Sequence, residues 1–311
     1  MGSICDGLGN RLQGVHGCRM LDLRDLDCLL ALTRHRHFAR AADQCGLSQP
    51  AFSMRIRNLE DRLGTQVVKR GNRFQGLTAE GERVVAHARS ILDEVRALEQ
   101  EVRAARGEVT GDLTIGTIPT AQPYAGLVAN RLRKTHPGIR PKIKSTTSLG
   151  VQQGVDDGSF DAGLTYAEGA SADLLVIEAL YSEEYVLLAP KGLVDGSDIA
   201  WADAAGLPLI LLEPEMQNRR ILDQIFADLG ALPTVVAETN GFIAAISMAQ
   251  AGMGATVVPR MMVETLGGLS RADLLPLKDP VIEKPVALVT PKRGQGIPVV
   301  EALRRTVVID Q

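Results

Sequence analysis

Hydrophobic positions near the start of the chain recur at helical spacing in three successive segments. These segments are residues 23–34, residues 38–45 and residues 49–63. Gly46 and Gly64 are expected to end the second and the third helix, because glycine readily takes the left-handed conformation after a helix. Two short helices joined by a tight turn that contains glycine are typical of a helix-turn-helix.

The third predicted helix begins with residues that are suited to reading DNA. Ser48 is its expected N-cap, and its outward face carries Gln49, Pro50, Ser53, Met54 and Arg57. Short polar side chains at the start of a recognition helix can reach base edges in the major groove. The alternative interpretation is a solvated helix with ordinary surface arginines.

The residues after this helix predict a basic wing. Residues 65–70 and residues 73–77 read as two short strands around a turn, with Lys69, Arg70 and Arg73 at the tip. Residues 48–76 hold six Lys/Arg and two Asp/Glu, which is a net charge of +4 and the kind of patch that neutralises DNA phosphates. The pattern therefore predicts a winged helix-turn-helix domain over residues 20–77.

A long helix with one narrow apolar seam is predicted next, over residues 78–107, with Thr78 at its start and Gly107 at its end. The apolar positions alternate in steps of four and three residues, and they are Val84, Ala88, Ile91, Val95, Leu98, Val102 and Ala105. Such a seam needs a partner helix, and the same helix of a second chain is the economical one. Packing of the seam on its own chain is the alternative.

From residue 111 onward the pattern changes to alternating strands and helices. Strands are expected over residues 113–117, 139–145, 162–166, 207–212, 234–237, 255–258 and 285–290. Helices are expected over residues 122–135, 216–229, 241–251 and 297–308. This alternation predicts an α/β fold with mainly parallel strands over residues 108–311.

Charge divides the chain at the same place. The formal net charge of the whole chain is −3, which by itself argues against a nucleic-acid partner. Residues 1–106, however, carry 17 Lys/Arg and 13 Asp/Glu, a net of +4, and residues 107–311 carry 17 and 24, a net of −7. The two parts are therefore expected to meet different partners.

Composition excludes several classes of protein. The chain is 45% hydrophobic and 23% charged, which rules out a disordered chain or a bare coiled coil. No apolar run approaches the roughly 18 residues of a membrane span. Residues 1–19 lack the apolar stretch of a secretory signal and are expected to be a disordered leader, either a tag or an upstream start. No membrane partner is expected.

The cysteines and the missing motifs argue against a metal centre or an enzyme. All four cysteines lie within the first 45 residues, at Cys5, Cys18, Cys28 and Cys45, and free thiols fit a reducing cytoplasm. The chain has no GxSxG, HExxH or P-loop motif, and paired carboxylates such as Glu183–Glu184 are expected to be solvated. We therefore expect no catalytic residue, no metal and no cofactor.

Several predicted strand ends carry hydroxyl or amide residues directly before a helix. In α/β folds ligands bind at the carboxyl ends of strands, and the free N–H groups of helix N-termini favour anions. Arg219 or Arg220 could clamp a carboxylate. The candidate residues for a small-anion site are Thr117, Pro119, Thr120, Thr147, Ser148, Gln217, Asn218, Arg219, Thr239 and Asn240. Each of them could instead be a plain N-cap.

The segment FARAADQCGLSQPAFSMRIRNLEDRLGTQVVKR, followed by LTAEGERVVAHARSIL, resembles the LysR-type transcriptional regulators. The likeness continues more loosely through GDLTIGTIPT, FDAGLTY and ISMAQAGMGATVVPR. It implies a sequence-specific regulator that binds double-stranded DNA and senses a small effector in a two-lobed domain similar to periplasmic solute-binding proteins. The first lobe would comprise residues 111–184 and 286–311, and the second lobe residues 185–285.

The resemblance also implies roles for single residues. Ser48, Gln49, Pro50 and Ser53 would face the major groove or its phosphates, and Arg57 and Arg70 would hold the backbone. Arg55 and Arg73 complete the candidate DNA-binding set. Met54 stands where the family often has a basic residue and Arg55 where it often has glutamine, so the base preferences stay open. The family places an effector contact in the TIPT segment, residues 117–120.

The resemblance further implies a homodimer, with a homotetramer usual in the family, acting in the cytoplasm, with RNA polymerase as a further partner to consider. The alternative function is a dimeric DNA-binding protein whose second domain binds protein partners and no small molecule. A test for binding of a small molecule distinguishes these two functions. The effector, the operator and the choice between activation and repression stay open.

Overall fold

The computed structural model describes residues 21–69, 71, 73–105, 109–267, 269–293 and 296–308. The expected leader over residues 1–19, the wing residue Arg70 and the expected helix end at Gly107 lie outside the described residues. The chain divides into two compact units between Arg96 and Ala97, and each unit is described by itself.

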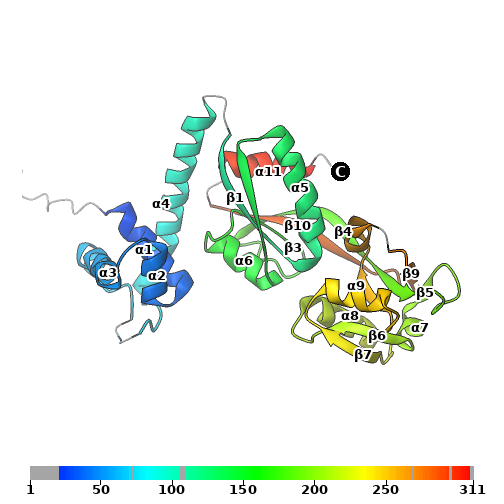
Figure 1. Ribbon diagram of the computed structural model, residues 1–311. Coiled ribbons are helices and arrows are strands. Elements are labelled where there is room, and N and C mark those ends of the chain that lie inside the picture. Colours follow the sequence, from blue (N-terminus) through cyan, green and yellow to red (C-terminus); the bar gives the residue numbers. More distant parts are fainter. Residues whose placement is uncertain are drawn as a thin grey trace, which may run out of the picture. The chain divides into compact units, whose positions relative to one another are not determined.

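The first unit is helical, and its helices follow the predicted pattern. They are α1 (Leu23–His35), α2 (Phe38–Gln44), α3 (Gln49–Leu63) and the first part of α4 (Ala79–Ala104) (Figure 1). Gly46 and Gly64 have φ angles of 64° and 68°, so both take the left-handed conformation after a helix that was expected of them. The helix-turn-helix is thereby confirmed.

One hydrophobic core holds these helices together. Leu29, Phe52 and Leu59 are fully buried at its centre, and Val85 and Ala88 of α4 also belong to it. The wing is less regular than predicted. Over the described part of residues 65–77 there is no continuous strand, and one antiparallel bridge joins Val68 to Leu77.

The predicted seam of α4 has two parts with different surroundings. Ala88 is fully buried in the core of its own chain, so this part of the seam packs within the chain, which was the alternative interpretation. Ile91, Leu98 and Val102 are exposed, and Leu98 reaches 62% exposure. Apolar side chains at a regular spacing on an exposed helix face favour a partner helix.

The second unit alternates strands and helices. Its strands are β1 (Gly111–Thr117), β2 (Ile139–Ser145), β3 (Ala162–Tyr166), β4 (Leu175–Pro190), β5 (Ile199–Ala200), β6 (Pro208–Leu212), β7 (Thr234–Thr239), β8 (Thr256–Pro259), β9 (Ala272–Lys278) and β10 (Glu283–Pro291). Its helices are the short 3-10 turn η1 (Pro119–Ala121), α5 (Gln122–Thr135), α6 (Ser148–Asp156), α7 (Trp201–Ala205), α8 (Gln217–Asp228), α9 (Phe242–Gln250), α10 (Arg260–Leu266) and α11 (Pro298–Val308).

The sheet is mixed, which corrects the expectation of mainly parallel strands. β1 pairs in parallel with β2 and β3, and β6 pairs in parallel with β7. β10 is antiparallel to β3 and β4, and β4 is antiparallel to β8 and β9. The long strand β4 changes partners along its length, since Glu184 pairs with β10 and Tyr185 pairs with β8.

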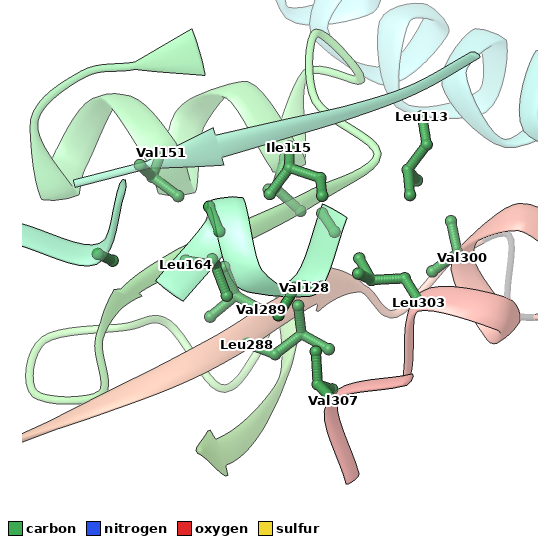
Figure 2. Close-up of a cluster of buried hydrophobic side chains, with 14 of the residues drawn as sticks. Leu113, Ile115, Val128, Val151, Leu164, Leu288, Val289, Val300, Leu303 and Val307 are labelled. Atoms are coloured by element: carbon green, nitrogen blue, oxygen red, sulfur yellow. The ribbon is translucent and has the colours of Figure 1, made fainter. Parts of the chain in front are cut away.

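We call the part of the unit built on β1, β2, β3, α5, α6 and α11 the first lobe, and the part built on β6 to β9 and α7 to α9 the second lobe. Leu113, Ile115 and Leu164 form the centre of the first lobe's core, and Leu303 of α11 packs against them (Figure 2). The second lobe has its own buried clusters, one around Trp201 and one around Ile246. β4 therefore runs from one core to the next.

Candidate functional site

The N-terminal end of α3 is an exposed polar surface on the first unit. Ser48 caps the helix, since its Oγ accepts a hydrogen bond from the Ala51 N–H at 3.4 Å. Gln49, Pro50 and Arg57 are exposed, and Ser53 is half-buried. These residues of the predicted DNA-binding set thus lie on one face of α3, which is the arrangement that a recognition helix needs.

Arg55 turns away from that face and toward α1. Its Nη1 donates hydrogen bonds to Asp25 Oδ1 at 2.7 Å and to Asp22 Oδ2 at 3.4 Å. Arg62 Nη1 donates to the other Asp25 oxygen at 3.0 Å. Asp25 is only 2% exposed, so two charge-assisted hydrogen bonds satisfy a buried carboxylate. Arg55 thereby joins α3 to α1, and its expected contact with DNA remains a prediction.

The wing is fastened to α3 by an acidic residue that the sequence analysis did not single out. Glu60 Oε1 accepts hydrogen bonds from the N–H groups of Val67 and Val68, at 2.9 and 3.1 Å. At the tip, Lys69 and Arg73 are exposed. A helix with a fixed wing and free cations beside it can neutralise phosphates on either side of a groove.

In the second unit, a pocket of about 240 Å³ is lined from both lobes. Six of the ten candidate residues line it, and they are Pro119, Thr120, Thr147, Ser148, Gln217 and Asn218. Ile118, Thr146, Tyr166, Met216 and Phe242 complete the lining. The helices α6 and α8 begin at this pocket, with Ser148 and Gln217 as their first residues. Helix N-termini offer unpaired N–H groups to a ligand.

A larger pocket of about 510 Å³ shares Pro119, Met216 and Phe242 with the small one. Its other lining residues are Gln122, Pro123, Ser145, Asn240, Gly241, Ile243, Met262, Thr265 and Leu266. Among the described residues that line either pocket, none carries a charge. The two pockets together offer hydroxyls and amides at one end and mostly apolar surface at the other.

Three candidate residues lie outside these linings. Thr117 is fully buried in β1. Thr239 Oγ1 accepts a hydrogen bond from the Gly241 N–H at 3.4 Å, which makes it a turn residue. Arg219 already has partners, because its Nε donates to Asp223 at 2.8 Å and its Nη1 donates to the Leu212 carbonyl at 2.7 Å and to Glu238 at 2.6 Å. These partners argue against Arg219 as a carboxylate clamp.

Comparison with known proteins gives these sites their context. A family model described as the LysR substrate binding domain matches residues 106–308, and one described as the bacterial regulatory helix-turn-helix protein, lysR family, matches residues 23–82. The chain belongs to the LysR family of transcriptional regulators. It is therefore a DNA-binding regulator with a domain that senses a small molecule, and it is not an enzyme, as predicted. A second domain that binds only protein partners is not favoured.

Individual relatives cover nearly the whole of this LysR-family chain. The hydrogen peroxide-inducible genes activator of Pectobacterium carotovorum subsp. carotovorum is 29% identical over 294 residues, which are 91% of this chain and 96% of that protein. The DNA-binding transcriptional dual regulator OxyR of Escherichia coli (strain K12) is 30% identical over 294 residues, which are 91% of this chain and 95% of that protein.

Solved structures share the fold of this LysR-family chain. A full-length OxyR variant from Pseudomonas aeruginosa superposes with a TM-score of 0.72 at 23% identity, covering 93% of this chain and 98% of that one. Full-length CbnR complexed with its target DNA superposes with a TM-score of 0.60 at 20% identity, covering 94% and 100%. Among the described helices of this regulator, none is both long enough and apolar enough to cross a membrane.

Next to the small pocket of this LysR-family regulator lies a buried carboxyl group that sequence reasoning missed. Glu183 was expected to be solvated, but it is only 3% exposed, so that expectation was wrong. The Tyr166 hydroxyl donates a hydrogen bond to Glu183 Oε1 at 2.9 Å. The oxygen of the same hydroxyl lies 3.4 Å from the Thr120 hydroxyl oxygen. The apolar run that follows at residues 185–189 was the one signal in the sequence that could have indicated a buried strand here.

Burial raises the pKa of Glu183 above its usual range, and the hydrogen bond from the Tyr166 hydroxyl offsets only part of this effect. The folded chain therefore holds this proton more tightly than the unfolded chain. Stability is fully present below the pKa of an unfolded glutamate and is lost as the pH rises through the raised folded pKa. Glu183→Gln should remove this loss, because the amide does not ionise.

The measurement is the melting temperature as a function of pH, followed by the fluorescence of Trp201, the sole tryptophan of the chain. Glu184→Gln is the matched control, because Glu184 lies on the same strand as Glu183 but is exposed. Its carboxylate pairs with Arg260 of α10 at 3.0 Å. Equal pH profiles for Glu183→Gln and the unmutated protein would show that Glu183 ionises normally.

Proposed function

We propose that this regulator binds its operator through the N-terminal end of α3 and the wing, and that its effector occupies the small pocket between the lobes. The observation that carries the proposal is the convergence of six candidate residues, from three separate chain segments, on one pocket of about 240 Å³. The proposed domains are residues 20–77 for DNA, 78–107 for dimerisation and 108–311 for the effector.

For DNA, the proposed contacts are Ser48, Gln49, Pro50 and Ser53 on the bases or nearby phosphates, and Arg57, Arg70 and Arg73 on the backbone. The exposure of the first turn of α3 supports the first group. Arg55 is proposed to position α3 through Asp25 and not to bind phosphate, because its guanidinium is already hydrogen bonded.

For the effector, we infer an acceptor group that faces the N-termini of α6 and α8. The macrodipoles and free N–H groups of two helices favour negative charge at this place, which supports an anionic effector. Thr120, Thr147, Ser148, Gln217 and Asn218 are the proposed contacts, with Pro119 and Asn240 beside the body of the ligand.

The exposed part of the α4 seam supports a homodimer, in which Ile91, Leu98 and Val102 pack against the same residues of a second chain. Two copies of α3 would then read two half-sites, and assembly to a tetramer would extend the contact. As a DNA-bound regulator, the protein is proposed to act in the cytoplasm on transcription by RNA polymerase.

The relative from Pectobacterium carotovorum is named an activator of hydrogen peroxide-inducible genes. This chain is proposed to differ from a thiol-based peroxide sensor in its second unit. Thiol oxidation requires a cysteine, and no cysteine lies beyond residue 45. In the first unit, burial raises the pKa of the Cys28 thiol to about 12, which suppresses the reactive thiolate. We infer that the effector binds without a covalent step.

A thermal-shift screen of small carboxylates, amides and inorganic anions tests the effector site, because a ligand that binds only the folded protein raises the melting temperature. A binder should also change the DNA footprint of the full-length protein. A broad panel without any shift would favour the alternative, a second domain that serves protein partners only.

Alanine substitutions at Gln49 and Arg70 should change DNA binding in different ways. Gln49→Ala should relax base preference at one position by about 1–3 kcal/mol, because a base contact discriminates sequences. Arg70→Ala should weaken binding to all sequences alike and lower the salt slope by about 1, because a phosphate contact releases a counterion. Fluorescence anisotropy with operator and scrambled DNA over a range of salt concentrations measures both effects.

Arg133→Ala is the matched control for this comparison, because Arg133 is an exposed arginine of α5 in the second unit. Its salt slope should equal that of the unmutated protein. An unchanged salt slope in Arg70→Ala would remove Arg70 from the proposed phosphate contacts.

A further inference from the structure

The small pocket contains a buried amide whose hydrogen bonds are unmade. Asn218, the second residue of α8, is 4% exposed, yet it lines the pocket. Neither its Oδ1 nor its Nδ2 has a hydrogen-bond partner among the described residues. A buried polar group without a partner destabilises a protein, and native chains rarely keep one without a use for it.

Several other polar groups around the pocket have partners. The Thr147 hydroxyl accepts from the Gly150 N–H at 3.0 Å, and the Ser148 hydroxyl lies 2.7 Å from that of Thr165. Tyr166 donates to Glu183. Asn218 is therefore the buried amide of the pocket that is left to pair with a ligand on both of its atoms, since the amide of Gln217 is exposed to water.

The Asn218 amide needs both a donor and an acceptor as partners, and a carboxylate offers acceptors only. Asn218 offers one acceptor oxygen and a donor NH₂ group, and this holds whichever of the two positions the oxygen occupies. A carboxylate presents acceptors only, so it would leave the Asn218 oxygen buried and unpaired. A group with a donor beside its acceptor, such as a carboxamide or the edge of a lactam, satisfies both atoms at once.

We propose that Asn218 determines effector specificity, by pairing with a carboxamide or an equivalent donor–acceptor edge of a ligand whose apolar body fills the large pocket. This inference rests on the proposed function, namely that the effector occupies these pockets. It replaces the anionic group inferred there by a neutral donor–acceptor edge, because no described lining residue carries a charge. Phe242 and Met216 border both pockets, so a body attached to the amide passes between them into apolar surface that includes Met262 and Leu266.

The first test needs no ligand. Asn218→Leu removes the unpaired amide at similar volume, so the melting temperature of the second unit should rise by roughly 2–4 °C, as Trp201 fluorescence reports. Asn130→Leu, the same change at an exposed position of α5, should leave the melting temperature unchanged. A fall in melting temperature for both Asn218→Leu and Asn218→Ala would show that Asn218 supports the fold, and the proposal would be wrong.

The second test uses matched pairs of small molecules, benzamide with benzoate and nicotinamide with nicotinate, on the full-length protein. The amides should raise the melting temperature and the carboxylates should not, and Asn218→Ala should weaken amide binding at least tenfold. Acetamide should bind more weakly than benzamide, since it leaves the large pocket empty.

The outcomes separate this inference from the proposed function. Carboxylates that bind as tightly as the amides, or an Asn218→Ala variant with unchanged amide affinity, would overturn the role of Asn218 and leave the effector pocket in place. Failure of every amide and every carboxylate to bind would overturn both.

Discussion

Gly81→Ala should destabilise the first unit by about 2–4 kcal/mol and abolish operator binding, because a methyl group has no room at this position. Gly81 lies in the first turns of α4, and a Cβ atom there would overlap the carbonyl oxygen of Val67. That carbonyl also accepts a hydrogen bond from the Thr78 N–H at 3.1 Å. Relief of the overlap would separate α4 from the base of the wing.

Hydrogen exchange of α1 to α3 measures this effect, since residues 21–96 contain no tryptophan or tyrosine that could report unfolding optically. Gly126→Ala is the matched control, because Gly126 is also helical, is exposed and has nothing within 4 Å of an added Cβ. It should stabilise α5 by roughly 0.5–1 kcal/mol through helix propensity. Normal stability and DNA affinity in Gly81→Ala would contradict the packing of α4 on the wing.

Asp25→Ala should cost the first unit about 2–3 kcal/mol. The buried carboxylate joins α1 to α3 through both of its oxygens, so its loss removes two charge-assisted hydrogen bonds at once. The cost stays below that of a fully buried ion pair, because Arg55 and Arg62 are 27% and 33% exposed and can turn toward water. These hydrogen bonds from Arg55 and Arg62 to Asp25 form a clamp between α1 and α3, and α3 should lose its orientation when the clamp is removed.

Two measurements check this prediction, namely hydrogen exchange of α1 and α3 and the ratio of operator to scrambled DNA affinity. Specific affinity should fall, while the salt dependence of nonspecific binding should steepen, because two arginines are freed to meet phosphates. Asp27→Ala is the control, since Asp27 is exposed on the same helix. A normal affinity ratio in Asp25→Ala would mean that the clamp does not orient the recognition helix.

The sequence predicted the first unit well because its signals are local. A serine N-cap and two left-handed glycines set the helix ends within a few residues of chain, and apolar spacing set the buried faces. The wing was less predictable. Its strands reduce to one bridge, because Glu60 of α3, and not a strand partner, binds the N–H groups of Val67 and Val68.

The second unit was harder to predict from the sequence, because its longest strand, β4, contributes to the cores of both lobes. β4 was missed entirely, and its partners β9 and β10 lie about 90 residues further along the chain. Glu178 and Glu183 interrupt its apolar pattern for different reasons, the first to pair with Arg304 at 2.8 Å and the second to accept from Tyr166. Neither partner can be inferred from spacing along the sequence.

The candidate pocket shows the same limit at the level of single side chains. Asn218 and Arg219 were predicted together, as neighbours at the start of one helix. Their side chains point in different directions. Asp223 lies one helical turn after Arg219 and accepts a hydrogen bond from its guanidinium, whereas Asn218 lines the pocket. Adjacent residues in a helix cannot be assigned one shared role from their type alone.

The uncharged lining of the pockets has a consequence for how the regulator responds to ionic conditions. DNA binding through arginines and lysines weakens steeply as salt rises, because each phosphate contact releases a counterion. Occupancy of a cavity without charged walls scarcely changes over the same range, since buried polar contacts are little screened. With the effector in these pockets, as proposed, ionic strength would weaken operator binding and leave effector binding nearly unchanged, so the salt concentration would set how much operator is bound at a fixed effector level.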